Sequence, residues 1–303
     1  MLDRINLLFR FAAIAEAGSL RQASQSLNIT QPALSRSLAT LEAIYGRPLL
    51  ERHARGVVPT EFGARLLSRV KRLKRDWQMT EDAMVEDRHS IEGVLRLACG
   101  PLWDSVILPK VIPTLQAQFP LLTVEMHHYA GPAIKTALIE GQIDVAFGGL
   151  SRLESDQNIL QQREFTVVHD RLVARSAHPV HKAARDDYSG LLESAWVVYS
   201  ADPIYEQQII HTVVERTGYM PEIRVRCASL LATLEVLENG DYLSMLPMGA
   251  FGQVRGRDLC IAPLDLGRRS GPTGARYRTG IADYPPFLAL MGLCEDFVQH
   301  HYA

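Results

Sequence analysis

Apolar side chains recur at helical spacing in the first 45 residues, in short runs bounded by residues that begin or end helices. The first run predicts a helix over about 4–17, capped by Asp3 and ended by Gly18. Ser19 stands three residues before Gln22, which is the spacing of a capping box, and opens a short second helix. The inward positions of these two helices are Leu7, Leu8, Phe11, Ile14, Ala15, Leu20, Ala23 and Leu27.

A third helix follows a turn of about four residues. Thr30 is a suitable N-cap, Pro32 is tolerated in a first helical turn, and Gly46 ends the run. Leu34, Leu38 and Leu41 share one face, and the other face is polar: Gln31, Ser35, Arg36, Ser37 and Thr40. This pattern predicts a helix-turn-helix with its reading helix. A basic three-helix packing module is the alternative.

The next segment predicts a small hairpin with a basic tip. Apolar pairs at 49–50 and 57–58 flank the polar run 52–56, and Gly56 suits a turn that needs positive φ. Such a wing brings Arg and His side chains to phosphate or to the minor groove. The expected DNA contacts are therefore Ser19, Thr30, Gln31, Pro32, Ser35, Arg36, Arg52, His53 and Arg55.

One long helix is predicted after Thr60, which can cap it. Its apolar residues fall at coiled-coil spacing, with Thr80 as the one polar member, and the opposite face is basic. The seam predicts dimerisation through Leu66, Val70, Leu73, Trp77 and Met84. The alternative is a helix packed on its own domain.

From Ile91 onward, strands and helices alternate, which indicates an α/β domain. No Gly-x-Ser-x-Gly elbow, Gly-x-Gly-x-x-Gly fingerprint or Walker loop is present, so we expect no catalytic site. No apolar stretch approaches ~18 residues, and no secretory signal is evident, so a cytoplasmic protein without a membrane segment is expected.

Charge is segregated along the chain. Residues 1–75 hold 13 Lys and Arg against 5 Asp and Glu, whereas residues 76–303 hold 19 against 29, so the net charges are +8 and −10. A basic first quarter favours a polyanionic partner for that part of the chain alone, although a merely solvated basic surface is the alternative.

Cysteine and histidine offer two weaker hypotheses. The four cysteines, Cys99, Cys227, Cys260 and Cys294, have no zinc or Cys-x-x-Cys spacing, and are expected to be reduced thiols. A redox role for Cys99 or Cys227 would need an exposed thiol of low pKa. The His pairs at 127–128 and 300–301 have no partner at metal-ligand spacing, so no metal or other cofactor is expected.

The run from Gly18 to Leu38, continued by Leu41, Glu42, Gly46, Pro48, Leu49 and Arg52, resembles the N-terminal signature of LysR-type transcriptional regulators. The departures are small: Gln22 replaces the first of two usual alanines, Leu50 stands where Phe is common, and Pro59 stands where Leu is common. Body segments such as 141–146 and 243–247 are similar to the family's effector domain.

This resemblance implies a winged helix-turn-helix at 1–60, a dimerising linker helix at 61–88 and a two-lobed α/β effector domain at 89–303, like a periplasmic binding protein. One lobe would span about 91–163 and 268–303, and the other about 164–267. The implied partners are double-stranded DNA, a small polar or anionic effector, and further copies of the chain in a homodimer or homotetramer, with RNA polymerase as another candidate. An enzyme fused to a DNA-binding head and a redox or metal sensor are the competing classes.

The expected effector site lies between the lobes. Gly100, Pro101, Leu102 and Trp103 follow the first strand, so backbone amides could bind an anion and Trp103 could form an apolar wall. Ser200 and Ser229 occupy positions that resemble the family's ligand-contacting loops. Asp104 and Asp202 are acidic and favour the alternative of a cationic or hydroxyl-rich ligand.

Overall fold

A computed structural model of the protein describes residues 2–53, 56–84, 87–129, 131–150, 159–184, 187–199, 203–247, 256–264, 266 and 270–302. The chain divides near residue 84 into two compact units. None of the described helices is long and apolar enough to cross a membrane.

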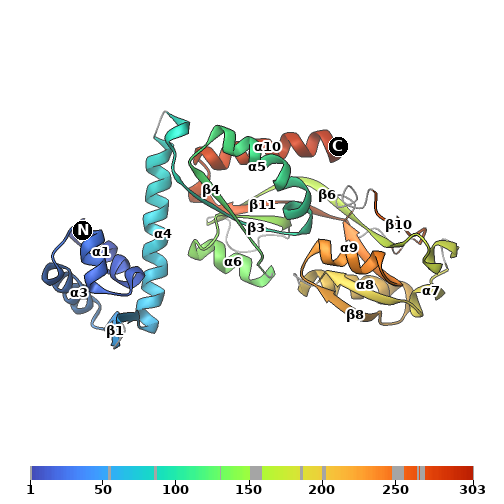
Figure 1. The fold of residues 1–303 in the computed structure, drawn as a ribbon, viewed down its shortest axis with the longest axis horizontal. Helices are drawn as coiled ribbons and strands as arrows, with labels where there is room; N and C mark the ends of the chain where they lie inside the picture. Colours follow the sequence, from blue (N-terminus) through green and yellow to red (C-terminus); the bar gives the residue numbers. More distant parts are fainter. Residues whose placement is uncertain are drawn as a thin grey trace. The chain divides into compact units, whose positions relative to one another are not determined.

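Three helices form the core of the first unit: α1 (Leu2–Ala17), α2 (Leu20–Ser26) and α3 (Gln31–Tyr45) (Figure 1). The predicted start of α2 and end of α3 are confirmed, because Ser19 Oγ accepts the Gln22 N–H at 3.4 Å and Gly46 ends α3 with a φ of 64°. Helix α1 begins at Leu2, so Asp3 lies in its first turn and is not the cap that the sequence predicts. Thr30 is the N-cap of α3, but its side chain makes no capping hydrogen bond. The buried cluster between these helices comprises Phe11, Ile14, Ala23, Leu34, Leu38, Leu41, Leu49, Leu50 and Val57.

The predicted wing is an antiparallel pair of β1 (Leu50–His53) and β2 (Gly56–Pro59). The Val57 N–H donates to the Gly18 carbonyl at 2.9 Å, so the hairpin is attached to the turn between α1 and α2. Gly56 has a φ of 141°, and a Cβ there would lie 2.3 Å from the Gly18 oxygen. Only glycine fits this close approach.

Helix α4 (Glu61–Ala83) begins where the sequence predicts, since Thr60 Oγ1 accepts the Gly63 N–H at 2.9 Å. Its first turns pack on the three-helix core through Phe62, Leu66 and Leu67. A Cβ on Gly63 would lie 1.9 Å from the Leu49 oxygen, so this glycine allows α4 to approach the backbone just before β1.

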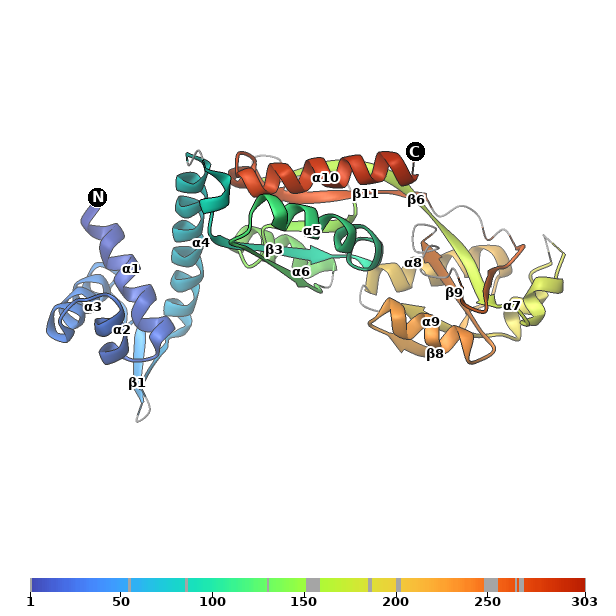
Figure 2. The same cartoon turned by 45° about the horizontal axis from the view of Figure 1, so that its top comes forward.

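The second unit contains a nine-stranded sheet in the order β4-β3-β5-β11-β6-β9-β7-β8, with β10 paired to β6. The sheet of lobe 1 contains β3 (Gly93–Cys99), β4 (Leu122–His127), β5 (Val145–Gly149), β11 (Ser270–Arg278) and the first part of β6 (Leu160–Arg175). Strand β3 pairs in parallel with β4 and β5, and β11 pairs antiparallel with β5 and β6. The helices of lobe 1 are α5 (Leu108–Gln118), α6 (Gly131–Glu140) and α10 (Pro285–Tyr302). Figure 1 and Figure 2 show α5 and α10 together on one face of this sheet, with α6 on the other.

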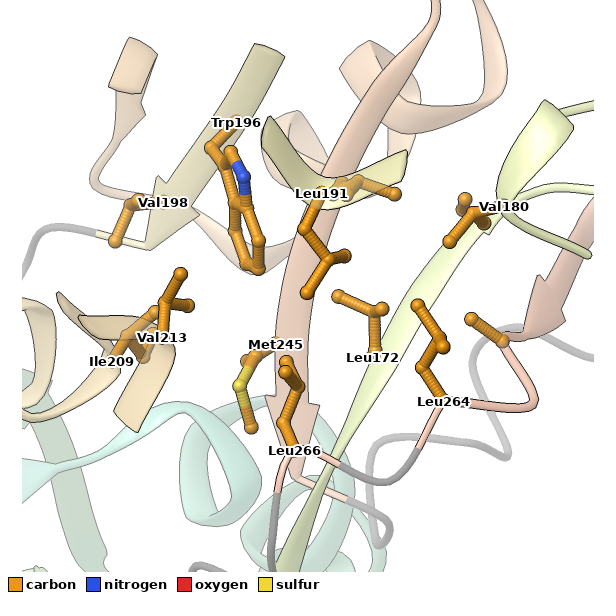
Figure 3. Close-up of a cluster of buried hydrophobic side chains, with 13 residues drawn as sticks. Leu172, Val180, Leu191, Trp196, Val198, Ile209, Val213, Met245, Leu264 and Leu266 are labelled. Carbon is orange, nitrogen blue, oxygen red and sulfur yellow. The ribbon is translucent and has the colours of Figure 1, made fainter. Parts of the chain in front are cut away.

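Lobe 2 combines the second part of β6 with β7 (Ala195–Tyr199), β8 (Glu222–Cys227), β9 (Tyr242–Pro247) and β10 (Leu259–Ile261). Its helices are α7 (Ser189–Leu192), α8 (Pro203–Thr217) and α9 (Leu230–Glu238). Successive residues of a strand face opposite sides. Trp196 and Val198 accordingly join a cluster with Ile209 of α8 (Figure 3), whereas Val197 packs with Leu234 of α9.

Strand β6 passes from one lobe to the other without a break. It pairs with β11 from Leu160 through His169, then with β9 from Asp170. The exchange of partners therefore occurs later than the expected boundary at 163–164. Because one strand serves both lobes, periodicity along the sequence contains no signal for the point of crossing.

Candidate DNA interface and effector site

Helix α3 presents the side chains expected to read DNA. Gln31, Pro32 and Arg36 are exposed and Ser35 is partly buried, while Leu34 and Leu38 anchor the opposite face in the core. Ser19 is partly buried at the cap of α2, and Thr30 is exposed. An exposed polar face on a helix held rigidly from behind is the geometry that major-groove recognition requires.

Wing residues Arg52 and His53 are exposed, and His53 Nε2 lies 3.8 Å from Glu51 Oε2. The third expected wing contact, Arg55, lies outside the described residues. Sequence reasoning missed Glu42, whose Oε1 accepts the N–H groups of Leu49 at 2.8 Å and Leu50 at 3.4 Å. This carboxylate attaches the end of the reading helix to the first wing strand. Its place in the resembling motif was the available signal.

The predicted dimer seam on α4 divides into two parts. Three seam residues have exposed apolar side chains, as expected for residues that contact a partner. Their exposed fractions are 44% for Leu73, 61% for Trp77 and 78% for Met84. Leu66 instead packs on the core of its own unit, and Val70 is only 2% exposed in the single chain. The single chain thus leaves little of the Val70 side chain exposed and covers Leu66 only in part, so dimerisation through these two residues stays a prediction.

Trp103 is a core residue and not an exposed apolar wall. It is 1% exposed, and its indole N–H donates to Thr273 Oγ1 at 2.8 Å. The Thr273 hydroxyl donates in turn to the Gly148 carbonyl at 2.9 Å. The ring packs against Phe147 and Phe165, with centroid distances of 4.7 and 5.4 Å. Trp103 thus packs in the interior of lobe 1, and Leu102 is likewise buried.

The backbone at the start of this helical segment offers few amides to an anion. The Gly100 N–H donates to the Phe147 carbonyl at 2.7 Å, and the Trp103 N–H donates to Gly100 at 3.0 Å. Pro101 has no N–H. Within the part of the chain that the structure describes, this leaves the Leu102 amide, so the anion site expected at 100–103 is reduced to one donor.

A π-helical turn, Trp103–Ile107, leads into α5. The Leu108 N–H donates to the Trp103 carbonyl five residues earlier. Pro109 follows and has no N–H to donate, which favours a widened turn here. The turn carries Asp104 and Ser105 at the carboxyl ends of β3 and β4.

Asp104 forms a polar cluster that sequence reasoning only partly anticipated. Its Oδ1 accepts the Ser105 hydroxyl at 2.6 Å, and its Oδ2 lies 3.4 Å from His128 Nε2. Burial raises the pKa of Asp104 above its ordinary value, against the opposing effects of the Ser105 hydrogen bond and the His128 charge. Open α/β sheets bind ligands beyond the carboxyl ends of their strands. The structure thus brings Asp104, Ser105 and His128 together where an effector is expected.

The two expected contacts in lobe 2 have different outcomes. Ser200 lies outside the described residues. Ser229 is exposed and is the N-cap of α9, where its Oγ accepts the Ala232 N–H at 3.5 Å. Ser229 therefore has a structural function that leaves its hydroxyl proton available.

Cys99 lacks the exposed thiol of low pKa that a redox sensor would need. Cys99 is 8% exposed, and burial, together with Asp104 and Cys294, raises the pKa of its thiol far above the ordinary value. Burial also raises the pKa of Cys294 to about 12. Cys227 is buried and Cys260 is exposed. Among the described residues, no group of three His, Cys, Asp or Glu side chains is placed to hold a metal ion.

A three-helix unit with a wing, followed by a two-lobed α/β domain, defines a class of bacterial DNA-binding regulators. Residues 5–64 match the family described as "Bacterial regulatory helix-turn-helix protein, lysR family", and residues 88–299 match the "LysR substrate binding domain". The chain belongs to the LysR family.

Individual relatives agree with this assignment. The nitrogen assimilation regulatory protein nac of Escherichia coli (strain K12) is 33% identical over 138 residues, and the match covers 45% of each protein, less than half of that relative's length. The SDS degradation transcriptional activation protein of Pseudomonas sp. (strain ATCC 19151) is 25% identical over 306 residues, covering 97% of this chain and 96% of the relative. A full-length OxyR variant from Pseudomonas aeruginosa shares the fold, with a TM-score of 0.70 at 16% identity over 96% of this chain and 94% of that one.

Proposed function

We propose that the protein is a cytoplasmic transcriptional regulator that reads a specific DNA sequence through α3 and responds to a small polar effector bound in its second unit. The observation that supports this most strongly is the exposed polar face of α3, which carries Gln31 and Arg36, in a unit whose wing also exposes Arg52. A Gln amide forms two hydrogen bonds with adenine, donating to N7 and accepting from N6, and an Arg guanidinium donates two to guanine O6 and N7. We also propose RNA polymerase as a candidate partner.

The test of DNA reading uses a duplex that the protein enriches from a random-sequence library, and a random duplex of equal length. Arg36→Ala should lower affinity for the enriched duplex roughly tenfold or more, because one good bidentate contact is worth ≈ 1–3 kcal/mol. Arg65→Ala is the matched control, since Arg65 is exposed on α4 and pairs with Glu61. Equal affinities of Arg36→Ala and wild type for both duplexes would remove α3 from the interface.

Wing residues should instead supply affinity that is independent of sequence. Each phosphate contact contributes about 0.9 to the slope of log affinity against log salt. Arg52→Ala, alone and with Arg55→Ala, should reduce that slope on enriched and random duplexes alike. An undiminished slope in the double variant would contradict a phosphate contact by the wing.

We propose that the protein is a homodimer, or a tetramer built from such dimers, held through the exposed part of the α4 seam. Leu73, Trp77 and Met84 offer apolar side chains at coiled-coil spacing, and a second copy offers the same surface. A dimer also places two reading helices on a two-fold symmetric DNA site. Sedimentation of the full-length chain over a range of concentrations measures this association.

We further propose that the effector binds between the lobes and contacts the Leu102 amide, Asp104, Ser105 and His128 from lobe 1. Because Asp104 is acidic and partly buried, the site favours hydroxyl or amino groups over a simple carboxylate. A thermal-shift screen of metabolites tests this, since a ligand at 100 times its dissociation constant stabilises the fold by ≈ 2.7 kcal/mol. The stabilisation should weaken in Asp104→Asn and remain in Asp283→Asn, which changes an exposed carboxylate elsewhere. Equal stabilisation in both variants would place the site elsewhere.

A further inference from the structure

Arg10 of α1 makes a side-chain hydrogen bond to the reading helix. Its Nη1 donates to Ser37 Oγ at 2.8 Å, and the Ser37 hydroxyl donates to the Ala33 carbonyl of α3 at 3.0 Å. Ser37 is only 6% exposed, so this bond lies at the interface of α1 and α3 and not in solvent. The apolar side chains in the core of this unit include Phe11 of α1 and Leu34 of α3.

The guanidinium of Arg10 has an unusual partner for a cation. Within the described residues, no carboxylate lies at ion-pair distance from Arg10, whereas Lys71 and Arg65 of the same unit pair with Glu16 and Glu61. A charged donor held on a neutral hydroxyl adds no charge balance. What it adds is direction, because a hydrogen bond weakens steeply with misalignment while apolar contact is non-directional.

Direction matters on α3 because Ser37 is adjacent in sequence to Arg36. Successive helical residues are separated by about 100° around the axis, so one faces α1 while the other faces outward. A helix with its side chains is about 10–12 Å in diameter, and a rotation of about 10° therefore moves a side-chain tip by about 1 Å. That shift is large compared with the spread of good hydrogen-bond distances, about 0.5 Å.

We propose that Arg10 is a positioning residue for sequence recognition, whose bond to Ser37 fixes the rotation of α3 against α1. The proposal rests on α3 being the reading helix. It assigns to Arg10 no contact with DNA. Loss of the bond should leave the helix in place, since the apolar core remains. It should widen the range of rotations of α3, and therefore the range of directions in which the Arg36 and Gln31 side chains point.

The experiment compares wild type with Arg10→Met, Arg10→Lys, Ser37→Ala and the Arg10→Met, Ser37→Ala double variant in the full-length chain. Each is titrated with the wild-type enriched duplex and with a random duplex over a range of salt concentrations. The ratio of the two affinities should fall about tenfold in Arg10→Met and in Ser37→Ala, with the random-duplex affinity and the salt slope unchanged. The tenfold figure follows because groups in contact commonly have interaction energies of 0.5–3 kcal/mol, and 1.4 kcal/mol corresponds to a tenfold change in affinity.

The double variant should lose no more than either single variant, because both remove the same bond. Arg10→Lys should retain part of the ratio, since an ammonium keeps a donor but not the planar fork. Matched controls are Arg65→Met on α4 and Ser26→Ala, whose hydroxyl donates to the Ala23 carbonyl of its own helix. Both should keep the wild-type ratio. Urea unfolding of every variant shows whether it is folded, and Ser37→Ala removes only one oxygen if Arg10→Met fails to fold.

Three results would overturn the proposal. A salt slope reduced by about 0.9 in Arg10→Met would make Arg10 a phosphate contact. An unchanged affinity ratio accompanied by lower stability would make the bond structural only. Additive losses in the double variant would show that Arg10 and Ser37 act separately. If Arg36→Ala left the ratio unchanged as well, the assignment of α3 as the reading helix would fail first.

Discussion

Replacing Trp103 with Phe tests whether this residue holds lobe 1 together or lines a ligand site. The substitution removes the indole N–H that donates to Thr273 Oγ1 at 2.8 Å, and it empties the space of the pyrrole ring between Phe147 and Phe165. Thr273 keeps its own bond to the Gly148 carbonyl, so the damage is limited to the indole.

The expected cost follows from these contacts. A lost hydrogen bond of this kind costs about 1 kcal/mol. The part of the ring that Phe lacks is worth roughly 2 kcal/mol, at about 0.8 kcal/mol per buried methylene-sized group. Trp103→Phe should therefore destabilise the second unit by about 3 kcal/mol.

Trp196 supplies a matched control. It is 0% exposed, and among the described residues its indole nitrogen has no hydrogen-bond partner. Trp196→Phe loses the same ring volume, at a cost of about 2 kcal/mol. It also removes an unpaired buried donor, which recovers about 1 kcal/mol, so the net loss of stability is about 1 kcal/mol. The difference of about 2 kcal/mol corresponds to a Tm roughly 4–8 °C lower for Trp103→Phe in a domain of this size. Circular dichroism during heating measures it. Equal Tm values, or a lower one for Trp196→Phe, would refute the reasoning.

Three further outcomes are expected. Leu73→Glu should weaken dimerisation in sedimentation and leave the circular dichroism spectrum unchanged. Val70→Glu should instead lower stability, because Val70 is buried in the single chain. The reverse pattern would contradict the division of the seam into an exposed and a buried part. Iodoacetamide at pH 8 should label Cys260 and spare Cys99, whose pKa is raised by burial, and equally rapid labelling followed by mass spectrometry would count against this. Burial lowers the pKa of His178 below 6.5, so the folded state favours the neutral ring and stability should fall as pH drops below about 6.5. Urea unfolding at pH 7 and pH 5 should show a smaller decline in His178→Asn, and an identical decline would exclude this histidine as the cause.

The sequence was most informative about the first unit because its signals are local. The helix boundaries depend on residues only a few positions apart. Ser19 and Thr60 mark helix starts through side-chain hydrogen bonds, and Gly46 marks a helix end through its positive φ. Such capping preferences act regardless of tertiary context. The fold of this unit could therefore be predicted in detail, although Ser37, expected on the polar face of α3, is buried against α1.

Helix α4 shows where periodicity stops being sufficient. Val70 and Leu73 belong to the same apolar seam, yet one is 2% exposed and the other 44%. Apolar spacing predicts that a helix face is buried, but it does not indicate whether the chain's own fold or a second copy buries it. Coverage by the chain's own fold or by a second copy depends on where the helix lies relative to its core.

Residues 100–103 alone could not predict the effector site, because the order of the strands decides which backbone N–H groups of this segment are already hydrogen-bonded. β3 and β5 are parallel neighbours with Cys99 opposite Phe147, although 48 positions separate these residues in the sequence. The next amide, that of Gly100, therefore continues the pairing and donates to Phe147 instead of to a ligand. A sequence places Gly100 before a helix, where free amides are expected, but only the sheet shows that one is already bound. The same strand order brings the end of β4 beside the end of β3, and this is why His128 meets Asp104 where the backbone alone would have been expected to bind an anion.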